Sequence, residues 1–339
     1  MQSLTLPLYR YLLITSYRQR CSKGFTLMEL LISLLIASMV IAGLLYGVVQ
    51  LTTMDKREAN LDQVQRDMNR AMEYITNDLQ EAVYVYPSPQ TVTTQLVADS
   101  SFPGGAGETP VLAFWRVDPL ETNLPTCNAA TMTAIDFQQC ELLKIRQAAY
   151  TLVVYVQKVN DSNQNWPGQS RIIRYELSKY SDLANLVVRS GYRDPTDPLD
   201  PKASFEAWQT NGTPAGSAAV LVDYVQAPTF TTPVALNRAP LNDTGGACYG
   251  YGLAGSSPIY RISPSNATTN NNNTFFACIR NPSIGTGVNT RGNQDVYLFL
   301  KGNVQSVSGG VRGYSNKTSL PILETQVLVK GVVNKGFSQ

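Results

Sequence analysis

The residue that most needs a chemical explanation is Glu29, because it stands at the start of a long apolar run. The twenty residues 30–49 (LLISLLIASMVIAGLLYGVV) contain no charged side chain. At about 1.5 Å per residue, a helix of that length spans about 30 Å, which is the thickness of a bilayer core. A carboxylate beside such a core is costly unless a cation pairs with it. Glu29 therefore predicts a cationic partner, while Thr26 and Glu29 together also fit the capping box of a helix start.

The rest of the chain offers few groups for catalysis or metal binding. There is no histidine, which removes Ser-His and Cys-His nucleophile pairs, histidine metal ligands and the commonest general base. Asp194, Asp197 and Asp200 lie close together in the segment DPTDPLD, and oxygen-rich loops can hold calcium. The prolines and the lack of an EF-hand pattern favour a solvated turn instead. We therefore expect no enzyme, no cofactor and no metal site.

Five cysteines are present, and four of them follow the apolar run: Cys127, Cys140, Cys248 and Cys278. An exported domain would meet an oxidising compartment there, in which disulfides persist. Four cysteines allow three pairings, and proximity in the sequence favours Cys127–Cys140 and Cys248–Cys278. A zinc site is the alternative, but no C-x-x-C spacing occurs. We expect two disulfides, each of which closes a loop.

Positive charge gathers at the start of the chain. Residues 1–24 carry Arg10, Arg18, Arg20 and Lys23 and no acidic residue. The whole chain has 27 Lys and Arg against 25 Asp and Glu, a net charge of +2, so the remainder has 23 basic residues and a net charge of −2. A near-neutral body lacks the clustered basic residues that nucleic acid binding requires. The basic start instead fits a cytoplasmic flank under the positive-inside rule.

A single long helix is predicted for residues 25–86. Beyond the apolar run the chain becomes charged, yet apolar residues recur every three or four positions, which is the pattern of one amphipathic face. No proline occurs in this range, and Pro87 and Pro89 then end the pattern. We expect a transmembrane part over 25–51 and an amphipathic part over 52–86, whose apolar stripe packs on the protein's own globular domain. The stripe consists of Leu61, Val64, Met68, Met72, Ile75, Leu79 and Val83.

Residues 87–339 are predicted to form one β-rich globular domain. Short runs rich in β-branched and aromatic residues alternate with loops rich in Gly, Pro, Asn, Ser and Thr. No segment with helical periodicity lies between these runs, so we expect an α+β fold with an antiparallel sheet, in which 150–157 and 171–177 pair. The stretch 241–293 is expected to be mostly loop. The predicted strands are 111–117, 150–157, 171–177, 185–189, 220–225, 295–300 and 326–329.

The segment 23–32, KGFTLMELLI, resembles the class III signal of type IV prepilins and type II secretion pseudopilins. The resemblance implies that a prepilin peptidase cuts between Gly24 and Phe25, removes the leader 1–24 and methylates the new amino group of Phe25. Gly24 has no Cβ, so an extended backbone can enter a peptidase cleft. Glu29 occupies the family's acidic position, where in a filament it would pair with the Phe25 amine of its own or a neighbouring subunit. A leader of this length is long for the family. The alternative, an ordinary secretory signal, would need a shorter apolar core with its cleavage site after that core.

Residues 61–82 (LDQVQRDMNRAMEYITNDLQEA) resemble the amphipathic half of J-type pseudopilins and of large W-type minor pilins. The resemblance implies a minor pilin or pseudopilin that primes or caps a filament of the type IV pilus or type II secretion kind. Its partners would be the prepilin peptidase and methyltransferase, other pilins or pseudopilins and an inner-membrane platform protein. The chain would cross the inner membrane once, with its C-terminal domain in the periplasm, before it joins the filament.

Two other functions and the role of one pair of glycines remain open. A pilus-displayed adhesin would use the Asn-rich loops, such as 268–274 (TTNNNNT), as its contact surface. A membrane-tethered enzyme is a further class, which the missing histidine disfavours. Gly43 and Gly47 form a small-xxx-small spacing that permits close approach of helices, although membrane helices also simply tolerate glycine.

Overall fold

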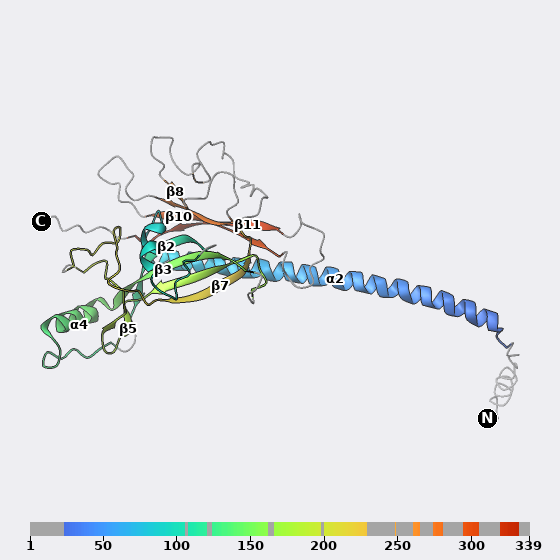
Figure 1. Ribbon diagram of the computed structural model, residues 1–339, viewed down its shortest axis with the longest axis horizontal. Coiled ribbons are helices and arrows are strands. Elements are labelled where there is room, and N and C mark those ends of the chain that lie inside the picture. The colour runs from blue at the N-terminus through green and yellow to red at the C-terminus, as the bar shows by residue number, and fades with distance from the viewer. Residues whose placement is uncertain are drawn as a thin grey trace, which may run out of the picture. The chain divides into compact units, whose positions relative to one another are not determined.

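A computed structural model describes part of the chain, and the structural statements below concern that part. The described residues are 24–105, 108–120, 124–161, 166–197, 200–228, 248, 260–264, 274–280, 294–304 and 319–331. The chain divides into two compact units, Met1–Lys56 and Arg57–Gln339. Helix α2 (Leu27–Gln80) is 54 residues long and contributes to both units (Figure 1). The second unit contains the strands and is called the globular unit below.

The globular unit has short helices inserted between the strands of an antiparallel sheet. Its helices besides the end of α2 are α3 (Gln90–Leu96) and α4 (Ala134–Arg146). The strands are β1 (Ala82–Val85), β2 (Glu108–Pro119), β3 (Ala148–Val159), β4 (Ser170–Leu177), β5 (Tyr180–Asp182), β6 (Val187–Val188), β7 (Ser217–Val225), β8 (Tyr260–Ser263), β9 (Phe275–Arg280), β10 (Asp295–Asn303) and β11 (Ser319–Leu328).

Nine of these strands form one sheet in the order β1-β2-β3-β4-β7-β10-β9-β8, with β11 on the other side of β10. Among the described strands every pairing is antiparallel. Strand β7 joins β10 through one residue pair, Val225 with Gly302, so the sheet has two halves that meet at this point. The predicted α+β fold, with its long N-terminal helix and antiparallel sheet, is confirmed. The predicted pairing of 150–157 with 171–177 is that of β3 with β4.

The apolar stripe is buried against the sheet as predicted from Val64 to Leu79, whereas Leu61 is only partly buried and Val83 lies in β1 rather than in α2. Its members Met68, Ile75 and Leu79 are almost completely inaccessible to solvent. They pack in one cluster with residues of both halves of the sheet, including Phe114 of β2 and Leu298 of β10. The spacing of three and four places these side chains on one face of the helix, and burial of that face supplies the apolar contact that holds helix and sheet together.

The end of the long helix differs from the prediction. Helix α2 ends at Gln80, and the next residues form β1, which pairs with β2 through Tyr84–Trp115 and Val85–Phe114. Its run Ala-Val-Tyr-Val is rich in residue types that favour strands. The outer edge of β1 is closed by Gln294, whose side-chain amide donates to the Val85 carbonyl at 2.8 Å and accepts from the Val85 amide at 2.9 Å. The helix predicted for 25–86 is therefore too long at its C-terminal end, because long-range pairing overrides the local pattern.

The expectation that no helix lies between the strands is also wrong. Helix α4 stands between β2 and β3. Thr133 caps it by accepting a hydrogen bond from the Asp136 amide at 3.2 Å, and Gln147 ends it in the left-handed conformation with φ of 48°. Only Cys140 and Leu143 of this helix are buried. An apolar face this narrow gives little periodic signal, which explains why the sequence pattern did not predict α4.

The predicted strands agree with the structure in most places. The ranges 111–117, 150–157, 171–177, 220–225 and 295–300 lie within β2, β3, β4, β7 and β10, and 326–329 overlaps the end of β11. The range 185–189 contains only the two-residue strand β6. Strands β8 and β9 fall in the stretch 241–293 that was expected to be mostly loop, and most of the rest of that stretch lies outside the described residues.

The four cysteines of the globular unit lie in the two predicted pairs at disulfide distance. The Cα atoms of Cys127 and Cys140 are 5.7 Å apart, and those of Cys248 and Cys278 are 5.4 Å apart. The first pair ties the middle of α4 to the segment before it, and Cys140 is fully buried. The second joins β9 to Cys248 in a small cluster with Phe276 and Phe299.

Replacing both Cys127 and Cys140 with serine is expected to lower the free energy of unfolding by about 3 kcal/mol. The bond would close a loop with a sequence separation of 13, and this is the usual effect of restricting the unfolded chain over such a loop. Peptide mapping under non-reducing conditions should recover both cysteine pairs. Free thiols in protein isolated from the cell envelope would contradict the pairing.

Candidate processing and assembly site

The segment Gly24–Thr26 precedes α2 and is not helical. Thr26 caps the helix, because its hydroxyl accepts a hydrogen bond from the Glu29 amide at 3.3 Å. The Thr26 carbonyl also accepts from the amides of Glu29 at 3.0 Å and Leu30 at 3.2 Å. One half of the predicted capping box is therefore present, and the Thr26 hydroxyl supplies it. The Glu29 carboxylate itself is exposed within the single chain, which leaves it available to a partner outside the chain.

The first part of α2 exposes a continuous apolar surface. Phe25 is 77% exposed, and the large apolar side chains from Leu27 to Met54 are exposed as well. Among the described residues, α2 is the one helix long and apolar enough to cross a membrane. Apolar surface on this scale requires cover from lipid or from other helices. The helix near the N-terminus is thus suited to be a membrane anchor.

Gly43 and Gly47 lie one helical turn apart in this part of α2. A Cβ atom built on either glycine meets no atom within 4 Å in the single chain. The spacing therefore leaves open space on the helix surface at these positions, where another helix could approach closely. The structure of one chain does not place a partner there.

A buried ionic cluster fixes the other end of α2 to the sheet. Asp78 is only 5% exposed, and three side chains from neighbouring strands donate to it. The Tyr155 hydroxyl lies 2.5 Å from one carboxylate oxygen and the Arg174 Nε lies 2.8 Å from the same oxygen. The Arg116 guanidinium lies 2.5 Å from the other oxygen. The cluster thereby joins α2 to β2, β3 and β4.

Further contacts hold the two arginines of this cluster in place. Arg116 also pairs with Asp118 at 2.6 Å, and Arg174 pairs with Glu176 at 2.5 Å. Burial alone would lower the pKa of Arg174, but its hydrogen bonds to Asp78 and Glu176 outweigh burial and raise that pKa. Both arginines therefore stay charged, and the carboxylates neutralise them away from solvent.

The sequence pattern predicted no role for Asp78 beyond its place in the segment 61–82. A signal was nevertheless present. Asp78 lies between Ile75 and Leu79, beside the apolar stripe, where a carboxylate must find a cation once the stripe is buried. Arg116 interrupts the otherwise apolar strand VLAFWRV, and Arg174 lies in the middle of the strand RIIRYEL. One-dimensional spacing could not show that these three residues meet.

The remaining candidate residues have structural partners or lie outside the described residues. Asp194 pairs with Lys179 at 2.7 Å, and Asp200 pairs with Arg193 at 3.1 Å. In the described part of the chain, no three potential metal-binding side chains come together. Residues 1–23 of the predicted leader 1–24 are outside the described residues. So is nearly all of the Asn-rich tract 268–274, on which the adhesin alternative rests.

Comparison with known proteins bears on the N-terminal segment. The prokaryotic N-terminal methylation motif matches residues 19–45, which include the Gly24–Phe25 bond, Glu29 and the first turns of α2. No curated protein and no solved structure matches the chain at a significant level.

Motif and fold together define the class of protein. A methylation motif that runs into an uncovered apolar helix, followed by an antiparallel β domain, indicates a membrane-anchored protein with a processed N-terminus. The motif is the class III prepilin signal, and it indicates a type IV pilin-like or pseudopilin-like protein. Such a signal implies processing by a prepilin peptidase and assembly with other pilins.

Replacing Gly24 with valine is expected to block removal of the leader while the protein stays in the membrane. A β-branched side chain beside the scissile bond restricts the extended backbone that a peptidase cleft must accept, whereas glycine does not. Gel mobility of the membrane fraction separates the two forms. Normal processing of this variant would show that Gly24 is not the residue before the cut.

Proposed function

We propose that this chain is a minor pilin or pseudopilin that primes or caps a filament of the type IV pilus or type II secretion kind. The observation that carries the proposal is the contrast between the two parts of α2. Its second part is buried in the globular unit, while its first part, which bears the methylation motif, exposes an apolar surface that the described chain leaves uncovered. In such a subunit the globular unit has its own packed core, while the apolar surface of the helix still needs cover from other helices. Assembly through helix contacts requires this combination.

The proposed route begins in the inner membrane. The chain crosses the membrane once, and the basic residues of the leader keep that end in the cytoplasm. The peptidase cuts after Gly24 and methylates Phe25, and a platform protein passes the mature subunit to the filament. A periplasmic position for the globular unit agrees with its two cysteine pairs at disulfide distance.

Glu29 is the proposed assembly residue. In the membrane its carboxylate needs a cation, and the nearest candidate in an assembled filament is the amine of Phe25, on its own or a neighbouring subunit. Pairing of these two charges would favour docking of a subunit at the base of the filament. The chain's role would then be structural rather than enzymatic, with the work of assembly supplied by other components.

A minor subunit fits better than a bulk subunit. The support is the resemblance of residues 61–82 to J-type pseudopilins and W-type minor pilins, together with a large globular unit. Asp78, which lies in that resembling segment, makes the contacts that lock the helix to the sheet. A large globular unit attached to an exposed apolar helix suits a position at the end of a filament.

The proposal is tested by where the chain lies on filaments and by how its deletion changes the number of filaments. Antibody labelling of sheared filaments should mark filament ends, and deletion of the chain should reduce the number of filaments. An adhesin would instead leave filament number unchanged on deletion and abolish attachment to a surface. Absence of the chain from filaments, with filament number unchanged, would contradict both roles.

A further inference from the structure

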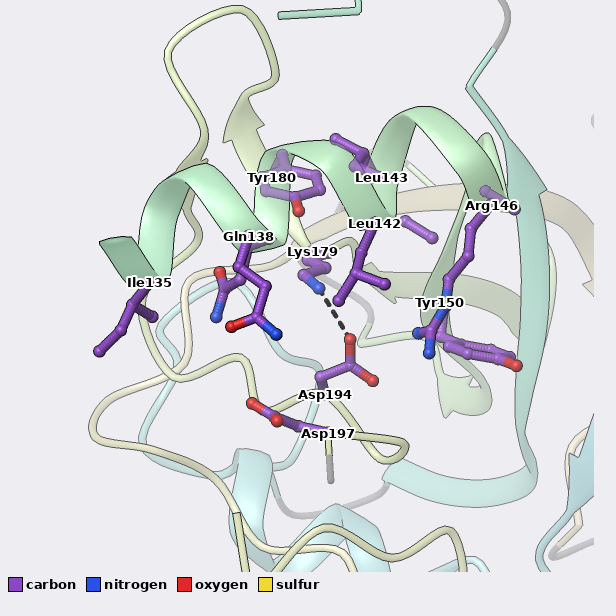
Figure 2. A pocket seen from close by; sticks show the side chains of 13 residues that line it. Ile135, Gln138, Leu142, Leu143, Arg146, Tyr150, Lys179, Tyr180, Asp194 and Asp197 are labelled. Atoms are coloured by element: carbon purple, nitrogen blue, oxygen red, sulfur yellow. Dashed lines mark hydrogen bonds and ion pairs between the residues drawn. The ribbon is translucent and has the colours of Figure 1, made fainter. Parts of the chain in front are cut away.

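A cavity of about 140 Å³ lies between α4, the start of β3 and the segment from Lys179 to Asp197. Figure 2 shows the side chains of Gln138, Leu142 and Arg146 extending from α4 toward Asp194 and Tyr150. The cavity is distinct from the processing site and from the Asp78 cluster.

Both sides of the cavity are held in place by buried contacts. On one side Cys140 and Leu143 anchor α4, and Cys140 lies at disulfide distance from Cys127. On the other side Lys179 pairs with Asp194 at 2.7 Å. Burial alone would raise the pKa of Asp194, but Lys179 and hydrogen bonds from Thr196 outweigh burial and hold that pKa below its usual range. The cavity is therefore built by fixed groups rather than left by a loose loop.

The lining limits what can fill the cavity. An apolar cavity of about 150 Å³ in another protein holds one benzene ring, so this one has room for about one six-membered ring. An apolar ring would strip water from the amide of Gln138 and the guanidinium of Arg146 without replacing their hydrogen bonds, which is costly. The occupant must therefore carry several hydrogen-bonding groups.

The lining also favours an occupant without net charge. Two cations, Arg146 and Lys179, are balanced by the carboxylates of Asp194 and Asp197. Beside these polar groups, the cavity offers the apolar side chain of Leu142 to the C–H groups of a ligand.

We propose that this cavity binds a single pyranose ring of a neutral saccharide, such as the end of a glycan chain. A pyranose is a six-membered ring with hydroxyls that donate and accept around its edge and C–H groups on its faces, which matches the amides, charged groups and apolar side chains of the lining. This binding role goes beyond the proposed assembly role and does not depend on it. A filament subunit could then bind a saccharide in the cavity while α2 contacts the other subunits.

The test uses the mature full-length protein in a detergent without a sugar headgroup. Saturation-transfer NMR with a panel of methyl pyranosides should detect binding of at least one of them. Gln138→Ala and Arg146→Ala should each weaken that binding by up to about tenfold, the effect of removing one hydrogen bond to a ligand. Lys144→Ala is the matched control, because Lys144 is on α4, is not among the residues that line the cavity, and contacts Glu141 at a long distance of 3.9 Å.

The proposal is overturned if no pyranoside in the panel binds, or if the control variant weakens binding as much as the two cavity variants. It is also overturned if a photo-crosslinker at position 138 captures a partner pilin and the pyranosides neither bind nor compete. Incorporation of Gln138→Ala into filaments should be normal, so failure of saccharide binding and failure of the assembly role give different results.

Discussion

Replacing Asp78 with alanine is expected to lower the free energy of unfolding of the globular unit by about 3 to 5 kcal/mol, the usual cost of removing one partner of a buried ion pair. The substitution leaves Arg116 and Arg174 with less of their neutralising charge, and it leaves the buried Tyr155 hydroxyl without its acceptor. Each buried group that loses its partner keeps its desolvation cost. The end of α2 would lose its polar attachment to three strands in one step.

Asp67→Ala is the matched control for this effect. Asp67 is on the same helix, but its side chain is 40% exposed and its contact with Arg70 is 3.9 Å long. An exposed pair of this kind contributes about 0.5 kcal/mol or less. Urea unfolding of the mature protein in micelles, followed by the fluorescence of the buried Trp115 and Trp208, measures both variants. Equal unfolding midpoints for the two variants would show that the Asp78 cluster does not hold the fold together.

Replacing Glu29 with alanine or glutamine is expected to abolish most incorporation into filaments while processing and folding stay intact. The carboxylate is exposed in the single chain and stands at the edge of an apolar helix surface. The carboxylate therefore stabilises the assembled filament only when a cation from another group pairs with it. The globular unit begins at Arg57, so its stability should not change. The measurement is the amount of each variant in sheared filaments relative to the amount in the membrane.

Thr26→Ala separates the charge of Glu29 from the helix cap. In the structure the cap is the Thr26 hydroxyl, which accepts from the Glu29 amide at 3.3 Å. Loss of a cap costs about 1 kcal/mol locally, and the carboxylate is untouched by it. We expect Thr26→Ala to assemble almost normally. If both Glu29 variants assemble like the wild type, or if Thr26→Ala fails as they do, the charge pair is not the basis of assembly.

Much of the architecture could be predicted from short-range patterns. The apolar stripe of α2 follows from its spacing of three and four, and Met68, Ile75 and Leu79 are buried as that spacing requires. Strands β2, β3, β4 and β10 are long runs of β-branched and aromatic residues, so they stand out locally. Such features depend on neighbours within a few residues, which is the information that one sequence carries best.

The early end of α2 and the missed Asp78 cluster have a common physical cause, because each depends on groups far apart in the chain, whereas the missed helix α4 has a local cause. The early end of α2 depends on the pairing of β1 with β2 and on Gln294, which is 209 residues from Val85. Helix α4 depends on a local cap and one narrow buried face rather than on a broad stripe. The meeting of Asp78 with Arg116 and Arg174 spans 38 and 96 residues. Proximity of this kind is set by topology and not by spacing.

The most direct test of the central claim is the mass of the N-terminal peptide of the mature protein. The claim is that the chain is a prepilin cut after Gly24, as the methylation motif over 19–45 indicates. Mass spectrometry should then find a peptide that begins at Phe25 and carries one added methyl group. A mature protein that begins beyond residue 49, after the apolar run, would mean that the run is an ordinary secretory signal and would contradict the account.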